Sequence, residues 1–201
     1  NTIGDRVATE EEKAQIKILL NAYNVALSDY GVTQTQAIND IANNSANGML
    51  ESYKQLVNKD ISDINKKIND IKDDVGGAIA DGIIEEAETL IIQNSIDQLN
   101  REKEDLDQRY QEIYNNNHLS STTKELLSTR YLNYNTAHTN LINQINTMIQ
   151  DKVATETEKM DYKTKLQTYN SSLSLVSRCF DTAINEIDQN NLNSVTGKLK
   201  K

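Results

Sequence analysis

Apolar residues recur along this chain at alternating spacings of three and four. In the stretch NKDISDINKKINDIKDDV, residues 58–75, an isoleucine or valine stands at positions 61, 64, 68, 71 and 75. Charged and amide side chains fill most of the positions between them. A period near 3.5 is typical of helices that bury one narrow apolar face, as in coiled coils. The pattern predicts such a helix here.

The same period extends over four longer stretches, which predict helices at about 9–43, 83–116, 120–150 and 155–189. We call the apolar positions of each helix its seam. The seam of the first helix is Ile16, Leu20, Tyr23, Leu27, Tyr30, Gln34, Ala37 and Ile41, and that of the last is Tyr162, Leu166, Tyr169, Leu173, Val176, Phe180, Ala183 and Ile187.

The first and last of these helices are copies of one sequence. DRVATEEEKAQIKILLNAYNVALSDY begins at Asp5, and DKVATETEKMDYKTKLQTYNSSLSLV begins at Asp151. At a fixed offset of 146, residues 5–41 and 151–187 are identical at 17 of 37 positions without a gap. A weaker copy of the opening, DGIIEEAET, begins at Asp81. The chain therefore contains an internal repeat.

Helix starts and turns are marked by local signals. A threonine followed three residues later by a glutamate predicts a capping box, in which each side chain accepts a hydrogen bond from the other residue's amide. Glycine-rich VGGAIADG, residues 75–82, predicts a turn. NNSANG, residues 43–48, is a weaker turn signal that either breaks or bends the first helix. The boxes are Thr9 with Glu12, Thr122 with Glu125, and Thr155 with Glu158.

Together these signals predict an all-α chain of long antiparallel helices. We expect a three-helix bundle at residues 80–190, because short loops make neighbouring helices antiparallel. Residues 1–47 form a long N-terminal helix, a partial copy of residues 151–189. That helix either belongs to a preceding unit or packs as an extra helix. Residues 48–79 are predicted as a coiled-coil connector, and residues 191–201 as a polar tail or linker.

The connector is predicted to associate with copies of itself. Isoleucine at both seam positions favours three or more parallel strands over two. The alternative is that the connector folds back onto the adjacent bundle. The side chains expected to carry the association, as a trimer, are Ile61, Ile64, Ile68, Ile71 and Val75.

Composition narrows the classes of protein to which the chain could belong. Apolar residues make up 37% of the chain, proline is absent, and a net charge of −9 comes with no basic cluster. Thin helices need less apolar mass than a wide core, and phosphate or anionic-membrane binding needs basic residues. We expect no nucleic-acid or membrane partner, since no apolar run approaches the ~20 residues that span a bilayer. The chain opens in mid-pattern, so we interpret it as part of a longer protein.

Several motifs resemble a helical module in tail proteins of phages and prophages of Gram-positive bacteria, termed minor structural, tail-tip or tail-fibre proteins. They are DGIIEEAE from Asp81, the YNNNHLS turn, AHTNLINQI, and the D-x-V-x-T-x-x-E-K helix starts. The likeness covers residues 81–190 and, in part, 5–41. Where that family often has glycine after the second aspartate, this chain has Lys152, and Arg6 in the N-terminal copy. The resemblance implies a virion component, often trimeric, at the host-facing end of the tail.

No catalytic, cofactor-binding or metal site is predicted. Asp81, Gly82, Ile84 and Glu88 match part of a calcium loop, but positions 1 and 3 of that loop lack oxygen ligands, which favours a plain turn and helix start. His138 lies in a seam, where a hydrogen bond to a tyrosine or a backbone carbonyl is expected. The tyrosines are interpreted as core residues with hydrated hydroxyls. Lone Cys179 is interpreted as a small packing residue.

The leading functional hypothesis is a structural spacer of a phage tail protein, which positions host-binding or wall-degrading domains and contacts other tail proteins in the virion. The alternative is an adhesion module that binds a host cell-surface glycan or protein. A third hypothesis is a bacterial surface or secreted helical protein, including helical toxins, located outside the cell or on its surface. An enzyme is the least favoured class, because no apolar pocket is predicted to tune a carboxylate.

Overall fold

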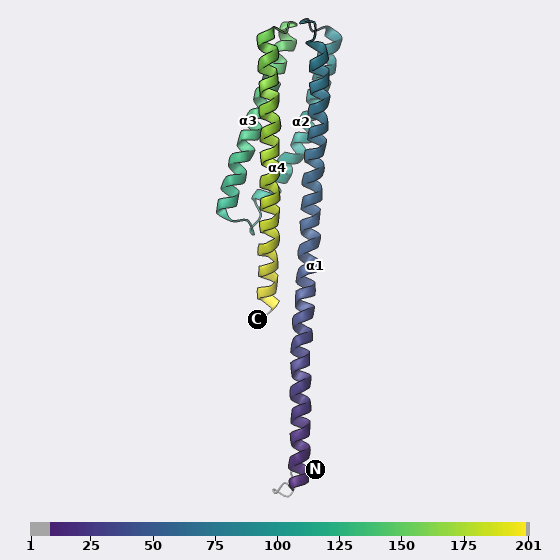
Figure 1. Cartoon of the computed structure of the whole chain (residues 1–201), viewed down its shortest axis with the longest axis vertical. Helices are drawn as coiled ribbons and strands as arrows, with labels where there is room; N and C mark the ends of the chain where they lie inside the picture. The colour runs from purple at the N-terminus through teal and green to yellow at the C-terminus, as the bar shows by residue number, and fades with distance from the viewer. Residues whose placement is uncertain (1–8, 200–201) are drawn as a thin grey trace. The chain divides into compact units, whose positions relative to one another are not determined.

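The computed structural model describes the backbone of residues 9–199 and the side chains of residues 9, 13–41, 52–191 and 193. Throughout this part of the chain the secondary structure is helical apart from the loops, which confirms the all-α prediction. The helices are α1 (Glu10–Ala78), α2 (Glu86–Tyr114), α3 (Ser121–Asp151) and α4 (Glu156–Leu199) (Figure 1). Backbone contacts divide the chain into two units, residues 46–191 and residues 1–45 with 192–201.

Helix α1 runs without interruption for 69 residues. It passes through residues 43–48, the weaker of the two turn signals. With no proline in the chain, every amide in this stretch can donate to the carbonyl four residues earlier. Gly48 weakens the helix by only about 1 kcal/mol relative to alanine. The stronger signal at 75–82 does end the helix, at Ala78.

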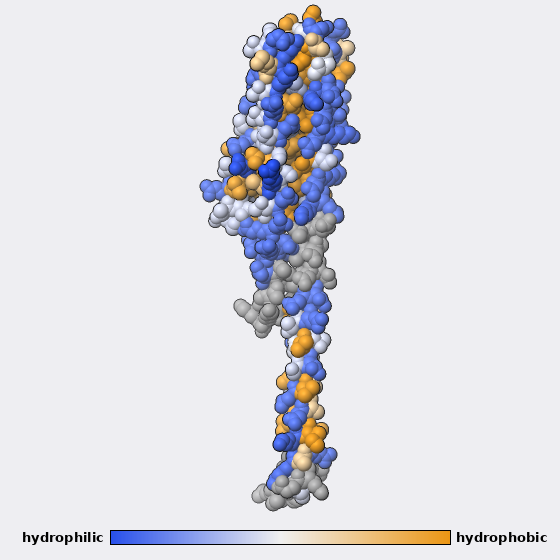
Figure 2. Space-filling model, in the orientation of Figure 1, coloured by the Kyte–Doolittle hydropathy of each residue, from blue (hydrophilic) through white to orange (hydrophobic). Residues whose placement is uncertain are grey.

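In the unit formed by residues 46–191, four helical segments share one core, where the sequence predicted three. The C-terminal part of α1 is the additional segment, and its seam is buried together with those of α2, α3 and α4. Figure 2 shows apolar side chains running along this unit between polar helix faces. The buried residues that α1 contributes are Val57, Ile61, Ile64, Ile68, Ile71, Val75 and Ala78.

The predicted connector is therefore part of the bundle. Ile64, Ile71 and Val75 have no exposed surface. Isoleucine at both seam positions, which favours higher oligomers, also suits the four-sided core of a single chain. The structure matches the fold-back alternative for residues 48–79. Self-association through the five predicted side chains would require the bundle to open.

Polar contacts show that α2 neighbours both α1 and α3 in the bundle. Lys67 of α1 donates to Gln98 of α2 over 2.6 Å. Tyr131 of α3 donates to Asp107 of α2, also over 2.6 Å. Because residues 79–85, 115–120 and 152–155 form short loops, successive helices run antiparallel. The bundle consists of two helical hairpins, α1 with α2 and α3 with α4.

The loops of the two hairpins lie at one end of the bundle (Figure 1) and bond to each other. The Ile84 amide donates to the Lys152 carbonyl over 3.0 Å, and the Ala154 amide donates to the Gly82 carbonyl over 2.9 Å. Gly82 and Lys152 both have positive φ, 86° and 54°. The weak sequence copy at Asp81 thus has a structural meaning, because it marks the equivalent loop of the other hairpin.

The predicted capping boxes have different outcomes. The box at Thr155 is confirmed: the Thr155 amide donates to Glu158 over 2.9 Å, and the Glu158 amide donates to the Thr155 hydroxyl over 3.3 Å. Thr9 directly precedes α1, and its carbonyl accepts from the Lys13 amide, but the Glu12 side chain lies outside the described residues. The box at Thr122 is wrong, because Ser120 caps α3 by accepting from the Thr123 amide.

Candidate functional site: an exposed apolar face on α1

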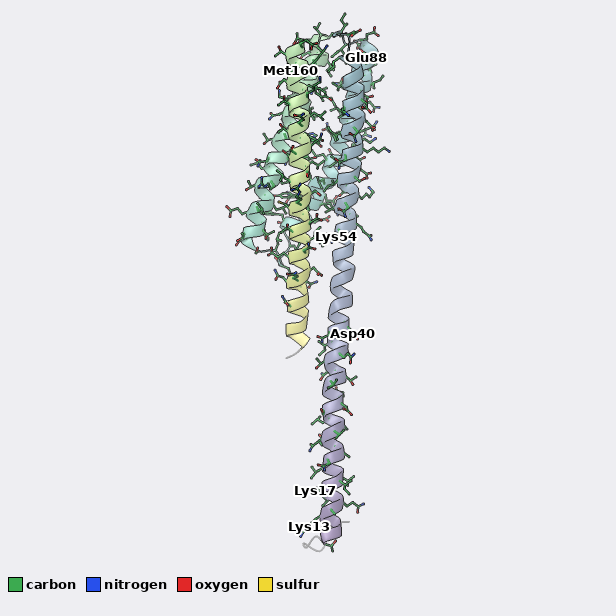
Figure 3. The ribbon with its side chains drawn as sticks, viewed as in Figure 1. Lys13, Lys17, Asp40, Lys54, Glu88 and Met160 are labelled. Carbon is green, nitrogen blue, oxygen red and sulfur yellow. The ribbon has the colours of Figure 1, made fainter. Side chains whose placement is uncertain are left out.

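Residues 13–41 of α1 expose a long row of apolar side chains. Lys13, Lys17 and Asp40 mark this part of the helix in Figure 3, and orange side chains lie along it in Figure 2. Soluble proteins rarely expose a continuous apolar face of this length unless it binds something. The exposed apolar residues in this part are Ile16, Ile18, Leu19, Leu20, Tyr23, Val25, Leu27, Tyr30, Val32 and Ile41.

The equivalent seam of α4 is buried. Leu20 is 55% exposed and its repeat partner Leu166 is 9% exposed. Tyr23 is 63% exposed, whereas Tyr169 has no exposed surface. Identical residues in the two copies therefore have opposite surroundings. The face on α1 has the sequence of a core face, and no described side chain covers it.

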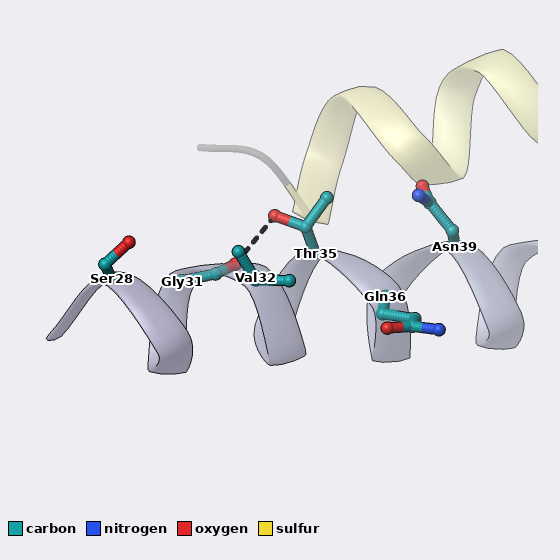
Figure 4. A pocket seen from close by; sticks show the side chains of 6 residues that line it. All are labelled: Ser28, Gly31, Val32, Thr35, Gln36 and Asn39. Carbon is teal, nitrogen blue, oxygen red and sulfur yellow. Dashed lines mark hydrogen bonds between the residues drawn. The ribbon is translucent and has the colours of Figure 1, made fainter. Parts of the chain in front are cut away.

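A depression of about 470 Å³ lies along the same helix (Figure 4). All of its lining residues come from α1, so it is an open surface of one helix. The Thr35 hydroxyl donates to the Gly31 carbonyl over 2.9 Å, which is a local contact within α1. Nothing in this geometry orients a reacting group. The lining residues are Ser28, Gly31, Val32, Thr35, Gln36 and Asn39.

A second hollow, a groove of about 370 Å³, runs between α1 and α4 in the bundle. Lys72, Lys159 and Lys163 line it beside Tyr162, and Gly76 forms part of its floor. The Tyr162 hydroxyl is buried without a hydrogen-bond partner among the described residues, and burial raises its pKa. Lys159 already pairs with Glu156, over 2.9 Å. The groove is basic, but no described group in it is placed to act as an acid or base.

His138 lies in the core, as the seam position predicted. Its Nε2 is 3.0 Å from the amide oxygen of Asn100, so its partner is neither a tyrosine nor a backbone carbonyl. Nδ1 is buried and has no partner among the described residues. Burial, and then the charge of Lys103, lowers the pKa of His138 from 6.5 to about 4. A neutral ring is therefore the buried form, and it packs beside Tyr134 and Tyr169.

The tyrosines of the bundle are core residues, but those at its centre bond to protein groups. The Tyr134 and Tyr169 hydroxyls lie 3.1 Å apart, and both rings are fully buried. Tyr131 stacks on Tyr110 with ring centroids 4.1 Å apart, while its hydroxyl donates to Asp107. Burial raises the pKa of Tyr131 far above its usual value. The sequence did not predict these pairings, because the partners come from different helices.

One buried ion pair was also not predicted. Asp60 of α1 is 5% exposed, and its Oδ2 lies 3.4 Å from Nε of Arg109 on α2. Burial raises the pKa of Asp60, and the Arg109 guanidinium opposes that rise. Arg109 also pairs with Glu112 over 2.5 Å. The pair links α1 to α2 and, with both groups held in the packing, fits a structural role.

The calcium-like motif forms a turn. The Asp81 carboxylate accepts from the Ile83 amide over 3.0 Å, and Glu88 accepts from the Glu85 amide over 2.9 Å. Both carboxylates are thus used at the start of α2. Among the described residues, no group of three or more His, Cys, Asp or Glu side chains could hold a metal ion. Cys179 is buried in the core, in agreement with a packing role, and burial raises the pKa of its thiol.

The loop end of the bundle carries a smaller apolar patch. Ile83 and Val153 are backbone bridge partners, and both side chains are exposed. Leu90 and Met160, also exposed, stand at equivalent positions of the two hairpins, because each follows its loop residue by seven positions. Figure 3 labels Met160 of α4 and Glu88 of α2, both at this end of the bundle. We call these four residues the loop-end patch.

Comparison with protein-family models, with curated proteins and with solved structures finds no match to this chain. In the described part of the chain, none of the helices combines the length and the hydrophobicity needed to cross a bilayer.

Proposed function

We propose that the chain is a structural spacer module of a phage tail protein. The observation that carries the proposal is α1, a single helix of 69 residues that supplies both the exposed repeat copy and one helix of the bundle. The buried titratable groups Asp60 and His138 are held in contacts between helices, which fits a mechanical role better than a chemical one.

The tail assignment comes from the sequence motifs at residues 81–190 and 5–41. In this proposal the module belongs to the virion, contacts other tail proteins, and holds host-binding or wall-degrading domains at a set distance. Self-association as a trimer is a separate part of the proposal, and through Ile61, Ile64, Ile68, Ile71 and Val75 it would require the bundle to open. Sedimentation of the chain at high micromolar concentration tests that part, and a purely monomeric species would contradict it.

The virion assignment is tested by labelling. An antibody raised against the 201-residue chain is applied to phage particles released from the bacterium that encodes it, and the particles are viewed by electron microscopy. We expect label at the host-facing end of the tail. Label confined to the cell wall, with unlabelled particles, would contradict the assignment and favour a bacterial surface protein.

A second candidate function is an adhesion module that binds a host cell-surface glycan or protein. The loop-end patch favours it, because its apolar side chains are exposed on two equivalent loops and on the first turns of the helices that follow them. The test is binding of the labelled chain to whole Gram-positive cells. Leu90→Glu with Met160→Glu should abolish binding, whereas Leu126→Glu with Leu132→Glu, two exposed positions on α3, should not. Equal binding by both variants would rule out the patch.

A further inference from the structure

We propose that residues 9–43 of α1 are the fourth helix of a second bundle. The other three helices of that bundle are a further copy of residues 46–150 that lies in the same chain and ends at residue 4. The proposal concerns the repeat architecture and does not depend on the tail assignment. It rests on the contacts that α4 makes within its own bundle.

The seam of the first copy keeps six of the ten residues that α4 buries between positions 156 and 187. Leu166, Tyr169 and Leu173 of α4 are in the core, and the first copy has the same residue at each equivalent position. Ala183, Ile184 and Ile187, also buried, are repeated without change. Elsewhere along the helices identity is lower, for example over residues 29–36, which match 175–182 nowhere. The identical positions at 20, 23, 27, 37, 38 and 41 are equivalent to buried positions of α4, although the exposed equivalents of positions 17, 24, 28 and 39 are also identical.

The first copy also keeps the polar groups through which α4 contacts the loop between α2 and α3. Glu186 accepts from the Ser120 amide over 2.6 Å and from the Thr123 hydroxyl. Asn190 donates to the His118 carbonyl over 2.7 Å. The equivalent residues, at an offset of 146, are an aspartate at position 40 and an asparagine at position 44. Both can make the same type of contact with an equivalent loop.

The start of the first copy matches the loop that precedes α4. Lys152 pairs with Glu86 of the other hairpin over 2.5 Å, and position 6 of the first copy is an arginine. Val153 bridges Ile83, and position 7 is again a valine. A D-x-V-A-T loop of this kind follows α3 and pairs with the DG loop between α1 and α2. The same D-x-V-A-T sequence at residues 5–9 is therefore accounted for by an α3-like helix directly upstream.

Four buried positions of α4 differ in the first copy, where Ile16, Tyr30, Thr33 and Gln34 stand in place of Tyr162, Val176, Cys179 and Phe180. Phe180, which packs edge-on against Tyr131, is replaced by Gln34. Lys165, which donates to Gln144 over 2.8 Å, is replaced by Leu19. The upstream copy is therefore expected to be related in sequence to residues 46–150 but adjusted at the positions equivalent to Tyr131 and Gln144.

The test replaces residues 1–4 of the chain with the missing helices. Residues 46–150 are fused directly before Asp5, so that the junction reproduces the natural step from 150 to 151. Amide hydrogen exchange of residues 16–41 is then compared with the original chain. We expect exchange to slow at least about a hundredfold, because amides in packed helices exchange only through larger opening reactions. Unchanged exchange in the extended chain would overturn the proposal.

Matched variants of the extended chain test the register. Leu20→Glu with Leu27→Glu should restore fast exchange, since both equivalents in α4 are buried. Ile18→Glu with Val25→Glu should leave exchange slow, because the α4 equivalents Thr164 and Ser171 are exposed. Loss of protection in both variants, or in neither, would overturn the assigned face.

A folding control and an occupancy control complete the experiment. In the folding control, residues 5–41 of the extended chain carry the sequence of residues 151–187, which provides the upstream bundle with its own fourth helix. Protection in this control but not in the natural sequence would overturn the proposal. The occupancy control is sedimentation of the original chain. If it is oligomeric and residues 16–41 are already protected, a second copy covers the face and the proposal fails.

Discussion

Leu27 of α1 and Leu173 of α4 occupy the same position of an internal repeat, yet Leu27 is 55% exposed and Leu173 is 2% exposed. Their sequence neighbours are also alike, since a serine follows each leucine. The difference lies entirely in what surrounds each helix. An apolar seam is thus a property of the helix, whereas burial is a property of the assembly. The two copies allow the contribution of packing to be measured with matched substitutions.

The largest expected effect separates the two copies directly. Leu173→Ala should lower the free energy of unfolding of the bundle by about 3 kcal/mol, because it removes buried surface and leaves a cavity. Leu27→Ala should change it by less than about 0.5 kcal/mol, as is usual for exposed positions. Urea unfolding followed by circular dichroism measures both. Equal losses would show that the Leu27 side chain is buried in solution.

Acid should destabilise the bundle that buries the second copy. His138 packs beside the Tyr169 ring, and its pKa falls from 6.5 to about 4 on folding. Above pH 6.5 the His138 ring is neutral in both the folded and the unfolded chain, so it has no effect on the pH dependence of stability. Below pH 6.5 the ring binds a proton in the unfolded chain before it does so in the folded one, and the free energy of unfolding therefore falls with pH. The bundle should lose about 2 kcal/mol by about pH 5.

The pH prediction has a matched control. Unfolding of the original chain is compared with His138→Gln and His118→Gln over the same pH range. His138→Gln should remove most of the slope, and His118→Gln should leave it unchanged. A slope that survives in His138→Gln would assign the acid sensitivity to carboxylates, which act mainly below about pH 4.5.

These contrasts also show what could be read from the sequence. Predicted helices at 83–116, 120–150 and 155–189 correspond to α2, α3 and α4, because hydrophobic period and capping are local properties. The fourth bundle helix was predicted as a helix, but its packing on the bundle was only the alternative, since the seam of residues 57–78 does not record whether its partner is the same chain or another. Glu186, which accepts from the Ser120 amide, could not be found either, because the two residues are 66 positions apart.

The apolar seam of residues 16–41 was recognised in the sequence, but it was not predicted to be exposed. Residues 9–43 were predicted as a helix belonging to a preceding unit or packing as an extra helix, and the structure adds that their seam is exposed. Self-association was assigned instead to the isoleucine seam of residues 61–75, which the structure buries in the bundle core. Isoleucine and leucine seams have the same period, so only the three-dimensional packing shows whether a seam is buried or exposed.

The hydrogen bond between the Tyr134 and Tyr169 hydroxyls allows a polar contact of the buried copy to be compared with the exposed copy. Tyr134→Phe should cost about 1–2 kcal/mol, because it leaves the buried Tyr169 hydroxyl without its partner. Tyr134→Phe with Tyr169→Phe should cost less than the sum of the single variants, since no unpaired hydroxyl remains. Tyr23→Phe in the exposed copy should have no measurable effect. Additive single and double effects would show that each hydroxyl is satisfied independently.

The smallest expected effect concerns a glycine that the buried copy lacks. Gly31 lies in α1 where the equivalent position of α4 is Ser177, and a Cβ added at Gly31 would contact nothing within 4 Å. Gly31→Ala should stabilise the helix by about 0.5–1 kcal/mol, because alanine loses less backbone entropy than glycine on folding. Hydrogen exchange of residues 27–35 should slow about two- to fivefold in the original chain. A larger slowing would mean that the methyl group contacts a partner, and therefore that this face of α1 is occupied in solution.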